Sequence, residues 1–574
     1  MADSDKNWDH YLRTLSASAR DSSPPASDPS LLQSVKKICE LCKSENSDDL
    51  VARVYPSINR LFQRSISSIP QSTSSHAFLL LAILQFFLDF GESVLHDADP
   101  SLTMFFRACL SRDFADPSIA EATIEFLNRN KKKLQTSFPT VLPQFFPLLL
   151  KLIAWNGEKL EKSFVKIFPT LVAPGSFLPL YPAILDLPVL VIALEKVEKS
   201  SGSLVGSSIA SIKSSTAPEM LLALMDEAYT GSTIAVGEGD SESEDNNTID
   251  VADPAFLDVL KDENDGIAER HWTSPAIASA IEAAKSAPQS DRLKQSLKIA
   301  PHLLDVYFAI ALRDVNDSLI CALIPLLMLR NAVIFPDKIY SYEVRKRFLE
   351  FMLASFQLSP NFIALLKKPI IDRLGEAYDS QEKTELALQL CWAIGEHGGG
   401  GESHKEAARE LFESLELLLY ENLSSSSRIG LRQESSLSFS RSSSLSISST
   451  GSERAAQSRL LCFVVTAIAK LATYHRELLP RARVSLAKVA RSRLSDSRVW
   501  TRARDCLGLL NEPAICMSVL GVSSRHPKGE KYPGTVNWSD GGTKMIAHVP
   551  FYILAGHAGP PFHDFAFSDI LPSK

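Results

Sequence analysis

The chain has 574 residues, of which 45% are hydrophobic, so it can bury large cores but is too long for one compact globule. Its 60 Lys and Arg residues are balanced by 67 Asp and Glu residues, which gives a net charge of -7 and excludes a nucleic-acid-type polycation. We therefore expect several domains or one extended repeat architecture, without direct binding of nucleic acid.

Residues 1–30 lack the apolar core of an export signal and are predicted to form a flexible N-terminus. The eight cysteines lie far apart in apolar surroundings, which indicates a reducing cytoplasmic setting. From position 31 on, apolar residues recur at helical spacing, and the first such stripe consists of Leu31, Val35, Ile38, Cys39 and Cys42.

Residues 31–230 are predicted to form the first part of an α-solenoid. Eight prolines between Pro139 and Pro188 stand where helices would start or stop, and they divide a very hydrophobic region into short helices. A long series of short helices is typical of stacked helical pairs that bury their faces against neighbours. The helix lengths suggest roughly 35 to 45 residues per pair, as in armadillo and HEAT repeats. The predicted fold class is all-α, an armadillo/HEAT-like α-solenoid with disordered loops and an irregular C-terminal tail.

Local composition predicts the nature of the segments after residue 230. Residues 231–254 are acidic and are predicted to be a disordered loop, and residues 255–423 are predicted to form the second part of the solenoid. Residues 424–455 are rich in serine, with three arginines interspersed between Ser424 and Ser452, so we expect a second disordered loop there. It could be phosphorylated, or it could be an insertion that the solenoid tolerates. The last solenoid helices are expected at 456–520. A Gly/Pro/aromatic tail is expected at 521–574.

The stretch CWAIGEHGGGGESH, residues 391–404, has the composition of an active site. An esterase oxyanion hole is not supported, because no G-x-S-x-G nucleophile elbow occurs in the chain. Cys391 and His397 lie six residues apart on one predicted helix, and their side chains would point in different directions. We therefore predict a structural role, with a helix apolar on nearly all sides before the glycines and a new helix from Ser403 after them.

Other catalytic and cofactor sites are also not predicted. Cys39 and Cys42 form the only C-x-x-C pair, and without a second pair they are better explained as helix core than as zinc ligands. No P-loop is present, and no catalytic residue, cofactor or metal is predicted. The longest clean apolar run, Ala77 to Leu88, is too short to span a bilayer.

A local excess of positive charge lies between Arg476 and Arg504. We define the basic patch as Arg481, Arg483, Lys488, Arg491 and Arg493, a candidate contact for a membrane or a partner. Anionic membrane surfaces attract such segments by about 1 kcal/mol per residue. A solvated outer face or a groove for an acidic partner is the favoured alternative, because exposed charged faces are the default.

Three segments resemble the trunk helices of adaptins, the large subunits of vesicle adaptor complexes. WAIGEH (392–397) is similar to the family's W-x-x-G-E-Y signature, AIAKLAT (467–473) to its A-x-x-K-L-x-T segment, and RARDCLGLL (502–510) to its R-A-x-x-Y-x-x-L-L end. FPLLLKLIAWN (146–156), ILDLP (184–188) and ELLPRARVSLAKV (477–489) more specifically resemble the zeta subunits of the fifth adaptor protein complex. We define the trunk signature, which is structural, as Trp392, Gly395, Glu396, Arg502, Ala503 and Leu509.

The resemblance implies a non-enzymatic large subunit of a heterotetrameric adaptor complex that acts in late endosomal protein transport. Its implied partners are the beta, mu and sigma subunits of the same complex, together with spatacsin and spastizin. The implied location is cytoplasmic, peripheral on late endosome or lysosome membranes, with room for a nuclear pool. The tail is expected to lack the folded ear of large adaptins. The alternative function is an α-solenoid scaffold in DNA double-strand break repair, which has also been attached to this family.

Overall fold

The structure is a computed structural model, and every regular element that it describes is a helix. The described residues are 10–18, 29–45, 47–69, 76–201, 279, 281–283, 289–359, 361–399, 404–434, 447–492 and 496–511. They divide into two compact units, one up to residue 310 and one from residue 311 on. The all-α prediction is confirmed.

The first unit begins with a helix over residues 10–18. The helices that follow are α2 (Pro29–Glu45), α3 (Asp48–Ser68), α4 (Ala77–Phe90), η2 (Glu92–Val94), α5 (Asp99–Met104), the π-helical turn η3 (Phe105–Leu110), α6 (Ser111–Asp113), α7 (Pro117–Arg129), α8 (Lys131–Ser137), α9 (Val141–Gln144), α10 (Phe146–Asn156), α11 (Glu158–Ile167), η4 (Phe168–Leu171), α12 (Pro174–Leu185), α13 (Leu187–Ser201) and α18 (Asp291–Asp314), which crosses the unit boundary.

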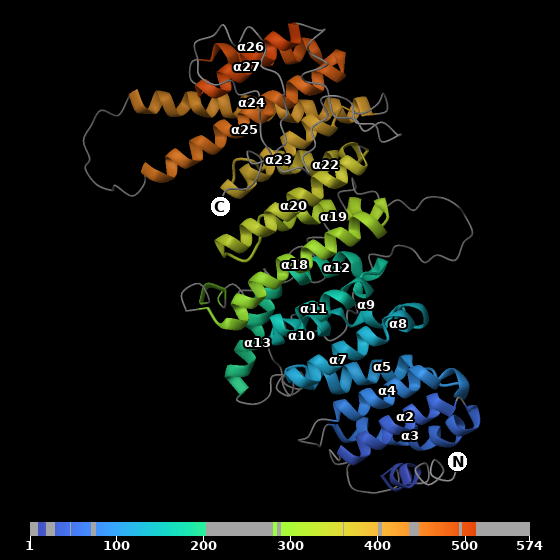
Figure 1. Cartoon of the computed structure of the whole chain (residues 1–574). Coiled ribbons are helices and arrows are strands. Elements are labelled where there is room, and N and C mark those ends of the chain that lie inside the picture. Colours follow the sequence, from blue (N-terminus) through green and yellow to red (C-terminus); the bar gives the residue numbers. More distant parts are fainter. Residues whose placement is uncertain are drawn as a thin grey trace. The chain divides into compact units, whose positions relative to one another are not determined.

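Within the first unit, α2, α4, α7 and α11 form a row in which each helix contacts the next (Figure 1). The predicted stripe on α2 is buried throughout. The prolines mostly stand at helix starts, as predicted, but Pro179 and Pro182 lie inside α12, contrary to the prediction. Pro182 is buried, and burial of apolar surface in the core offsets the lost backbone hydrogen bond there.

The second unit is a stack of helical pairs. Its helices are α19 (Asp317–Arg330), α20 (Lys338–Leu358), α21 (Phe362–Leu365), α22 (Lys367–Gly375), α23 (Gln381–His397), α24 (Lys405–Glu434), α25 (Ile447–Tyr474), η6 (Arg476–Leu478), α26 (Leu479–Arg491) and α27 (Ser497–Asn511).

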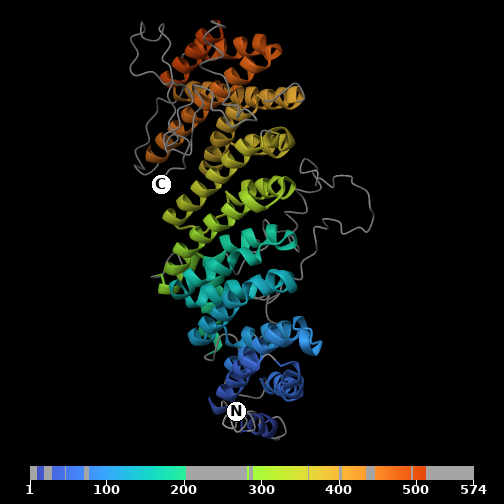
Figure 2. The same cartoon turned by 45° about the vertical axis from the view of Figure 1, so that its right-hand side comes forward.

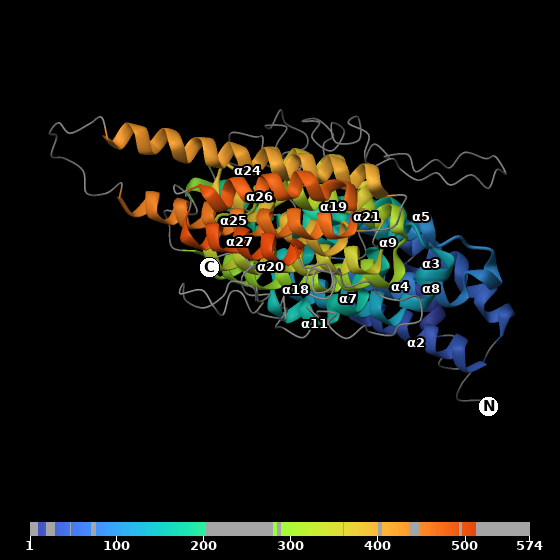
Figure 3. The ribbon, with the colours of Figure 1, turned by 90° about the horizontal axis from the view of Figure 1, so that it is seen from above.

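The pairs α22/α23, α24/α25 and α26/α27 follow one another along this stack (Figure 2). One layer holds α23, α25 and α27, and the other holds α22, α24 and α26. Figure 3 shows α24 and α26 on one side of this stack and α25 and α27 on the other. The first two pairs begin at Lys367 and Lys405, within the predicted period of roughly 35 to 45 residues, but the third begins at Leu479, well beyond it, because the long helices α24 and α25 and their connection lie between. This arrangement is that of an α-solenoid.

One stretch in the described helices, Ala455–Tyr474 of α25, is long and apolar enough to cross a bilayer, and a second candidate arises only if the bent pair α12 and α13 is counted as one span. In the structure, 72% of the most apolar window of Ala455–Tyr474 is buried. It packs against α23, α24, α26 and α27. A helix that is apolar on several sides and mostly buried against four neighbours is typical of the core of a helical stack.

Three predicted segments look different in the structure. Helix occupies residues 10–18 of the expected flexible N-terminus, where Leu15 is buried and the Ser18 carbonyl accepts a hydrogen bond from Arg64. Backbone helix also continues to Glu434 and resumes at Ile447, inside the expected serine-rich loop. The unit boundary falls inside the expected solenoid part 255–423. The acidic segment 231–254 and the tail 521–574 lie outside the described residues.

Candidate functional site

Two of the segments that carry the adaptin resemblance meet where α23 packs on α25. Glu396 lies near the C-terminal end of α23, and Lys470 lies opposite it on α25. The Lys470 ammonium donates a hydrogen bond to the Glu396 carboxylate, and the two side chains are only 1% and 5% exposed. An ion pair removed from water depends on both partners, because either charge alone would remain desolvated.

Gly395 allows the two helix backbones to approach closely at this ion pair. A Cβ atom on Gly395 would lie 3.4 Å from the Cα atom of Ala467 and 3.4 Å from the Cδ atom of Lys470. One turn further on, Gly398 faces Leu471 in the same way, so α23 and α25 run in the same direction. A larger residue at position 395 would push the helices apart and separate the buried charges.

The glycine run that follows α23 packs against α25 as well as connecting two helices. A Cβ atom on Gly399 would lie 2.8 Å from the ring of Tyr474, closer than side chains tolerate. Gly400, Gly401 and Ser403 lie outside the described residues, and α24 begins at Lys405. The sequence prediction treated the glycines as a connection only, and close packing against Tyr474 adds a second reason for glycine here.

Cys391 and His397 are both buried, and neither is poised for catalysis. Burial raises the pKa of the Cys391 thiol, so the reactive thiolate is disfavoured. Burial, together with the nearby Lys470 ammonium, lowers the pKa of His397 to about 4, so its imidazole is neutral near pH 7. The centroid of its ring lies 6.3 Å from the ring centroids of both Phe356 and Trp392. These surroundings fit the predicted structural role of residues 391–397.

The third segment of the resemblance joins the same layer through α27. Arg502 is fully buried and donates from its Nε atom to the Thr466 hydroxyl of α25, with 2.8 Å between the two atoms. The six residues of the trunk signature therefore lie in the packed interior of one layer of the second unit: Trp392, Gly395 and Glu396 on α23, and Arg502, Ala503 and Leu509 on α27. The structure brings the signature together around α25.

The basic patch lies on α26 and is largely engaged by neighbouring helices. Arg481 contacts two carboxylates of α24, with 2.9 Å to Glu413 and 2.6 Å to Glu416. Arg483 donates to the Leu510 carbonyl at the end of α27. Lys488 lies 4.5 Å from the centre of the Tyr420 ring, again on α24. These three side chains of the basic patch, a candidate contact for a membrane or a partner, thus connect α26 to its neighbouring helices α24 and α27.

Arg491 is the remaining described member of the basic patch, and it is exposed at the end of α26. Arg493 lies outside the described residues. The free charge of the patch is therefore concentrated at the C-terminal end of α26, and it is smaller than the sequence indicates.

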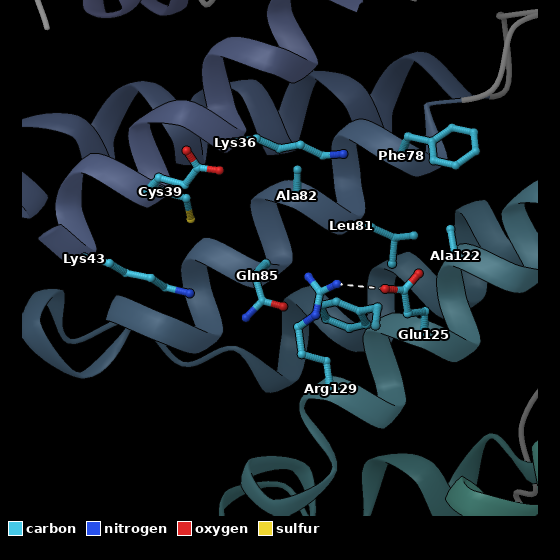
Figure 4. A pocket seen from close by; sticks show the side chains of 12 residues that line it. Lys36, Cys39, Lys43, Phe78, Leu81, Ala82, Gln85, Ala122, Glu125 and Arg129 are labelled. Carbon is cyan, nitrogen blue, oxygen red and sulfur yellow. Dashed lines mark hydrogen bonds and ion pairs between the residues drawn. The ribbon is translucent and has the colours of Figure 1, made fainter. Parts of the chain in front are cut away.

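A cleft of about 320 Å³ opens between α2, α4 and α7 in the first unit (Figure 4). Its floor is apolar except at Gln85, and charged residues stand at its rim, where Arg129 pairs with Glu125 at 2.9 Å. Cys39 lines the cleft, and burial raises its pKa to about 12. Cys42 is buried behind it on the same helix, and no group of residues in the described part of the chain could hold a metal ion.

Two family models match the chain. One, described as AP-5 complex subunit, vesicle trafficking, matches residues 26–151, and the other, described as AP-5 complex subunit zeta-1, C-terminal TPR repeats, matches residues 254–531. The AP-5 complex subunit zeta-1 of Mus musculus is 24% identical over 503 residues, and that of Homo sapiens is 25% identical over 460 residues. These alignments cover 85% and 78% of this chain. No solved structure matches.

The chain belongs to the family of AP-5 zeta subunits. It spans about half of the length of the curated relatives, 55% of the mouse protein and 50% of the human protein. The first family model includes the cleft, and the second includes the whole trunk signature. TPR repeats, named in the second description, are helical pairs that stack into a solenoid, as the second unit does.

Sequence reasoning identified the signature residues of this zeta-family chain but missed the partners of two of them. Lys470 stands in the quoted AIAKLAT segment, and its position there was the available signal for the ion pair with Glu396. Thr466, the partner of Arg502, lies one residue before that segment. The cleft of the first unit had no signal in any single segment, because three separate helices form it.

Proposed function

We propose that this chain acts as a non-enzymatic large subunit of a heterotetrameric vesicle adaptor complex in late endosomal protein transport. Membership of the AP-5 zeta family carries the proposal. The all-helical stack supports it, since solenoids provide long binding surfaces. The buried state of the trunk signature supports a scaffold role, because these residues hold helices together and face one another in the interior.

The proposed partners are the beta, mu and sigma subunits of the same complex, with spatacsin and spastizin as further associates. The proposed location is the cytoplasmic side of late endosomes or lysosomes. Purification of the tagged full-length chain from cells, followed by mass spectrometry, tests this directly. We expect the three other subunits to co-purify in equal amounts. Recovery of nuclear double-strand break repair factors in their place would favour the alternative scaffold function.

We also propose peripheral contact with the endosomal membrane through the free end of the basic patch. Arg491 is exposed and carries this part of the proposal, whereas Arg481 is already engaged by Glu413 and Glu416. Arg491→Glu should weaken binding of the assembled complex to phosphoinositide vesicles, since a cation near an anionic leaflet contributes about 1 kcal/mol. Arg409→Glu, which changes an exposed arginine on α24, is the matched control. Equal vesicle binding by both variants and the wild type would remove α26 from the membrane contact.

A further inference from the structure

The cleft of the first unit is built from three parallel rows of side chains. Each of the helices α2, α4 and α7 lines it with residues at positions i, i+3, i+4 and i+7: Lys36, Cys39, Glu40 and Lys43 from α2, Phe78, Leu81, Ala82 and Gln85 from α4, and Ala122, Glu125, Phe126 and Arg129 from α7. Residues with this spacing lie on one face of a helix. Three helix faces therefore line one hollow, with α4 as its floor (Figure 4).

The floor of the cleft is apolar except at Gln85, and it is partly uncovered. Phe78 is 41% exposed, which is unusual for a phenylalanine of a core helix. Next to it, the small side chains of Ala82 and Ala122 leave the space that the cleft occupies. An exposed aromatic ring beside small residues is the arrangement that receives an apolar anchor from a partner.

The rim of the cleft carries an unbalanced positive charge on the α2 side. Glu40 pairs with Lys37 at 3.0 Å, and Glu125 pairs with Arg129 at 2.9 Å, so both carboxylates of the rim are already neutralised. Lys43 reaches Asp89 at 2.7 Å. Lys36, in contrast, makes no hydrogen bond or ion pair within the described residues. The α2 wall thus offers one free cation directly above the apolar floor.

We propose that this cleft binds an amphipathic helix from a protein partner, with apolar residues on the face toward α4 and a carboxylate on the edge toward α2. A helix placed along α4 would present its own i, i+3, i+4 and i+7 residues to the three rows, which is the helix-in-groove mode of recognition. The carboxylate would pair with Lys36 and fix the orientation of the bound helix. This inference rests on the proposed function, because the partner is sought among the subunits of the adaptor complex.

A lipid surface fits the cleft less well than a helix does. The hollow is concave, so a flat bilayer surface would not reach its apolar floor, and the free cation of Lys36 alone would attract anionic headgroups only weakly. Membrane binding through the cleft is therefore an outcome that would contradict the proposal.

The test uses the full-length chain co-expressed with the beta, mu and sigma subunits. A zero-length carbodiimide reagent couples a carboxylate to a lysine amine only when the two are in contact. We expect an amide crosslink from Lys36 to an Asp or Glu in a helical segment of one of these subunits. Lys36→Arg keeps the positive charge but removes the amine, so this variant should still assemble and should lose the crosslink.

Two further variants test the apolar floor. Phe78→Ser should raise the Kd for the crosslinked subunit about tenfold, the usual effect of removing an apolar anchor from an interface. Ala82→Trp, which fills the cleft, should have at least the same effect. Leu365→Ser, which changes a 53% exposed leucine of α21 in the other unit, is the matched control and should leave the Kd unchanged. Melting curves of each purified variant establish that it is folded.

The possible outcomes are distinct. Normal assembly of Phe78→Ser and Ala82→Trp, with no crosslink at Lys36, overturns the inference and leaves the proposed function intact. A crosslink from Lys36 to a segment of this same chain, or loss of vesicle binding with normal assembly, also overturns it by naming a different occupant. A wild-type chain that binds none of the three subunits removes the proposed function and the inference together.

Discussion

Each of the two layers of the second unit contains an ion pair between neighbouring helices, and the two pairs differ in their exposure to water. Between α23 and α25, Glu396 and Lys470 pair in the dry interior at 5% and 1% exposure. Between α24 and α26, Arg481 pairs with Glu413 where both side chains remain more than 40% exposed. Both contacts link a helix to the next helix of its own layer, but only the first is removed from water.

The difference shows why the trunk signature can be recognised in the sequence. In the contact between Glu396 and Lys470, which we call the dry contact, the small residues Gly395 and Ala467 let the backbones approach, and neither buried charge can be removed alone at low cost. In the contact between Arg481 and Glu413, which we call the wet contact, the long arginine side chain of α26 reaches across to α24, and solvent screens the ion pair. Strong constraints on residue type therefore accumulate in one layer, and four predictions test this comparison.

The largest effect is expected from removal of one partner of the dry ion pair. Lys470→Met leaves the Glu396 carboxylate buried without its ammonium, so the free energy of unfolding of the second unit should fall by about 3 to 5 kcal/mol. Urea denaturation measures the loss. The double variant Glu396→Leu/Lys470→Met, which removes both charges, should be more stable than Lys470→Met alone. A double variant as unstable as the single one would show that helix packing, and not the charge, sets the cost.

The second prediction concerns the close approach of the two backbones. Gly395→Leu should overpack the contact with Ala467 and lower the free energy of unfolding by about 1 to 3 kcal/mol. Gly395→Ala should cost less, because its added Cβ atom would lie 3.4 Å from its nearest neighbours, close to an ordinary contact. Thermal melts of both variants decide this. If the leucine variant melts at the wild-type temperature, the helices are not held at this distance by Gly395.

The third prediction uses the buried imidazole beside the dry ion pair. Because the pKa of His397 is lowered to about 4, the unfolded chain binds a proton between pH 6.5 and pH 4 that the folded chain does not bind. Stability therefore falls as the pH drops below 6.5, with a contribution from this residue of about 2 kcal/mol between pH 7.5 and pH 5.0. His397→Phe should lose this part of the pH dependence while keeping an aromatic ring beside Trp392. Equal slopes in the two proteins would mean that His397 is open to protons in the folded state.

Some of these features depend on local sequence patterns and could be predicted, whereas others depend on contacts between distant segments and could not. Helical spacing, as in the stripe on α2, predicted the all-α stack, because periodicity is a local property. The resemblance to adaptin motifs, which occur here in the same order, identified the residues of α23 and α27 that form the trunk signature. The pairing of Glu396 with Lys470 spans 74 positions, and the cleft needs three helices, so neither follows from local patterns. The ion pairs of Arg481 with α24 could not be predicted either, because their partners lie far away in the sequence. The free positive charge predicted for α26 was therefore too large.

The smallest effect is expected in the wet contact. Arg481→Ala removes a half-exposed pair with Glu413, a pair with the 15% exposed Glu416 and a cation over the Phe412 ring. Because Arg481 itself is 45% exposed, the free energy of unfolding should fall by at most about 1 kcal/mol. Because solvent and salt screen these charges, the loss of stability in Arg481→Ala should shrink in 0.5 M salt, about three times the physiological ionic strength. The loss in Lys470→Met should persist, because buried pairs are screened much less. Arg409→Ala, which breaks a more exposed pair within α24, is the control and should cost roughly 0.3 to 0.5 kcal/mol. Urea denaturation of the three variants at both salt concentrations separates the contacts. A salt-independent loss of several kcal/mol in Arg481→Ala would place this pair in the same class as Glu396 and Lys470 and remove the distinction between the two layers.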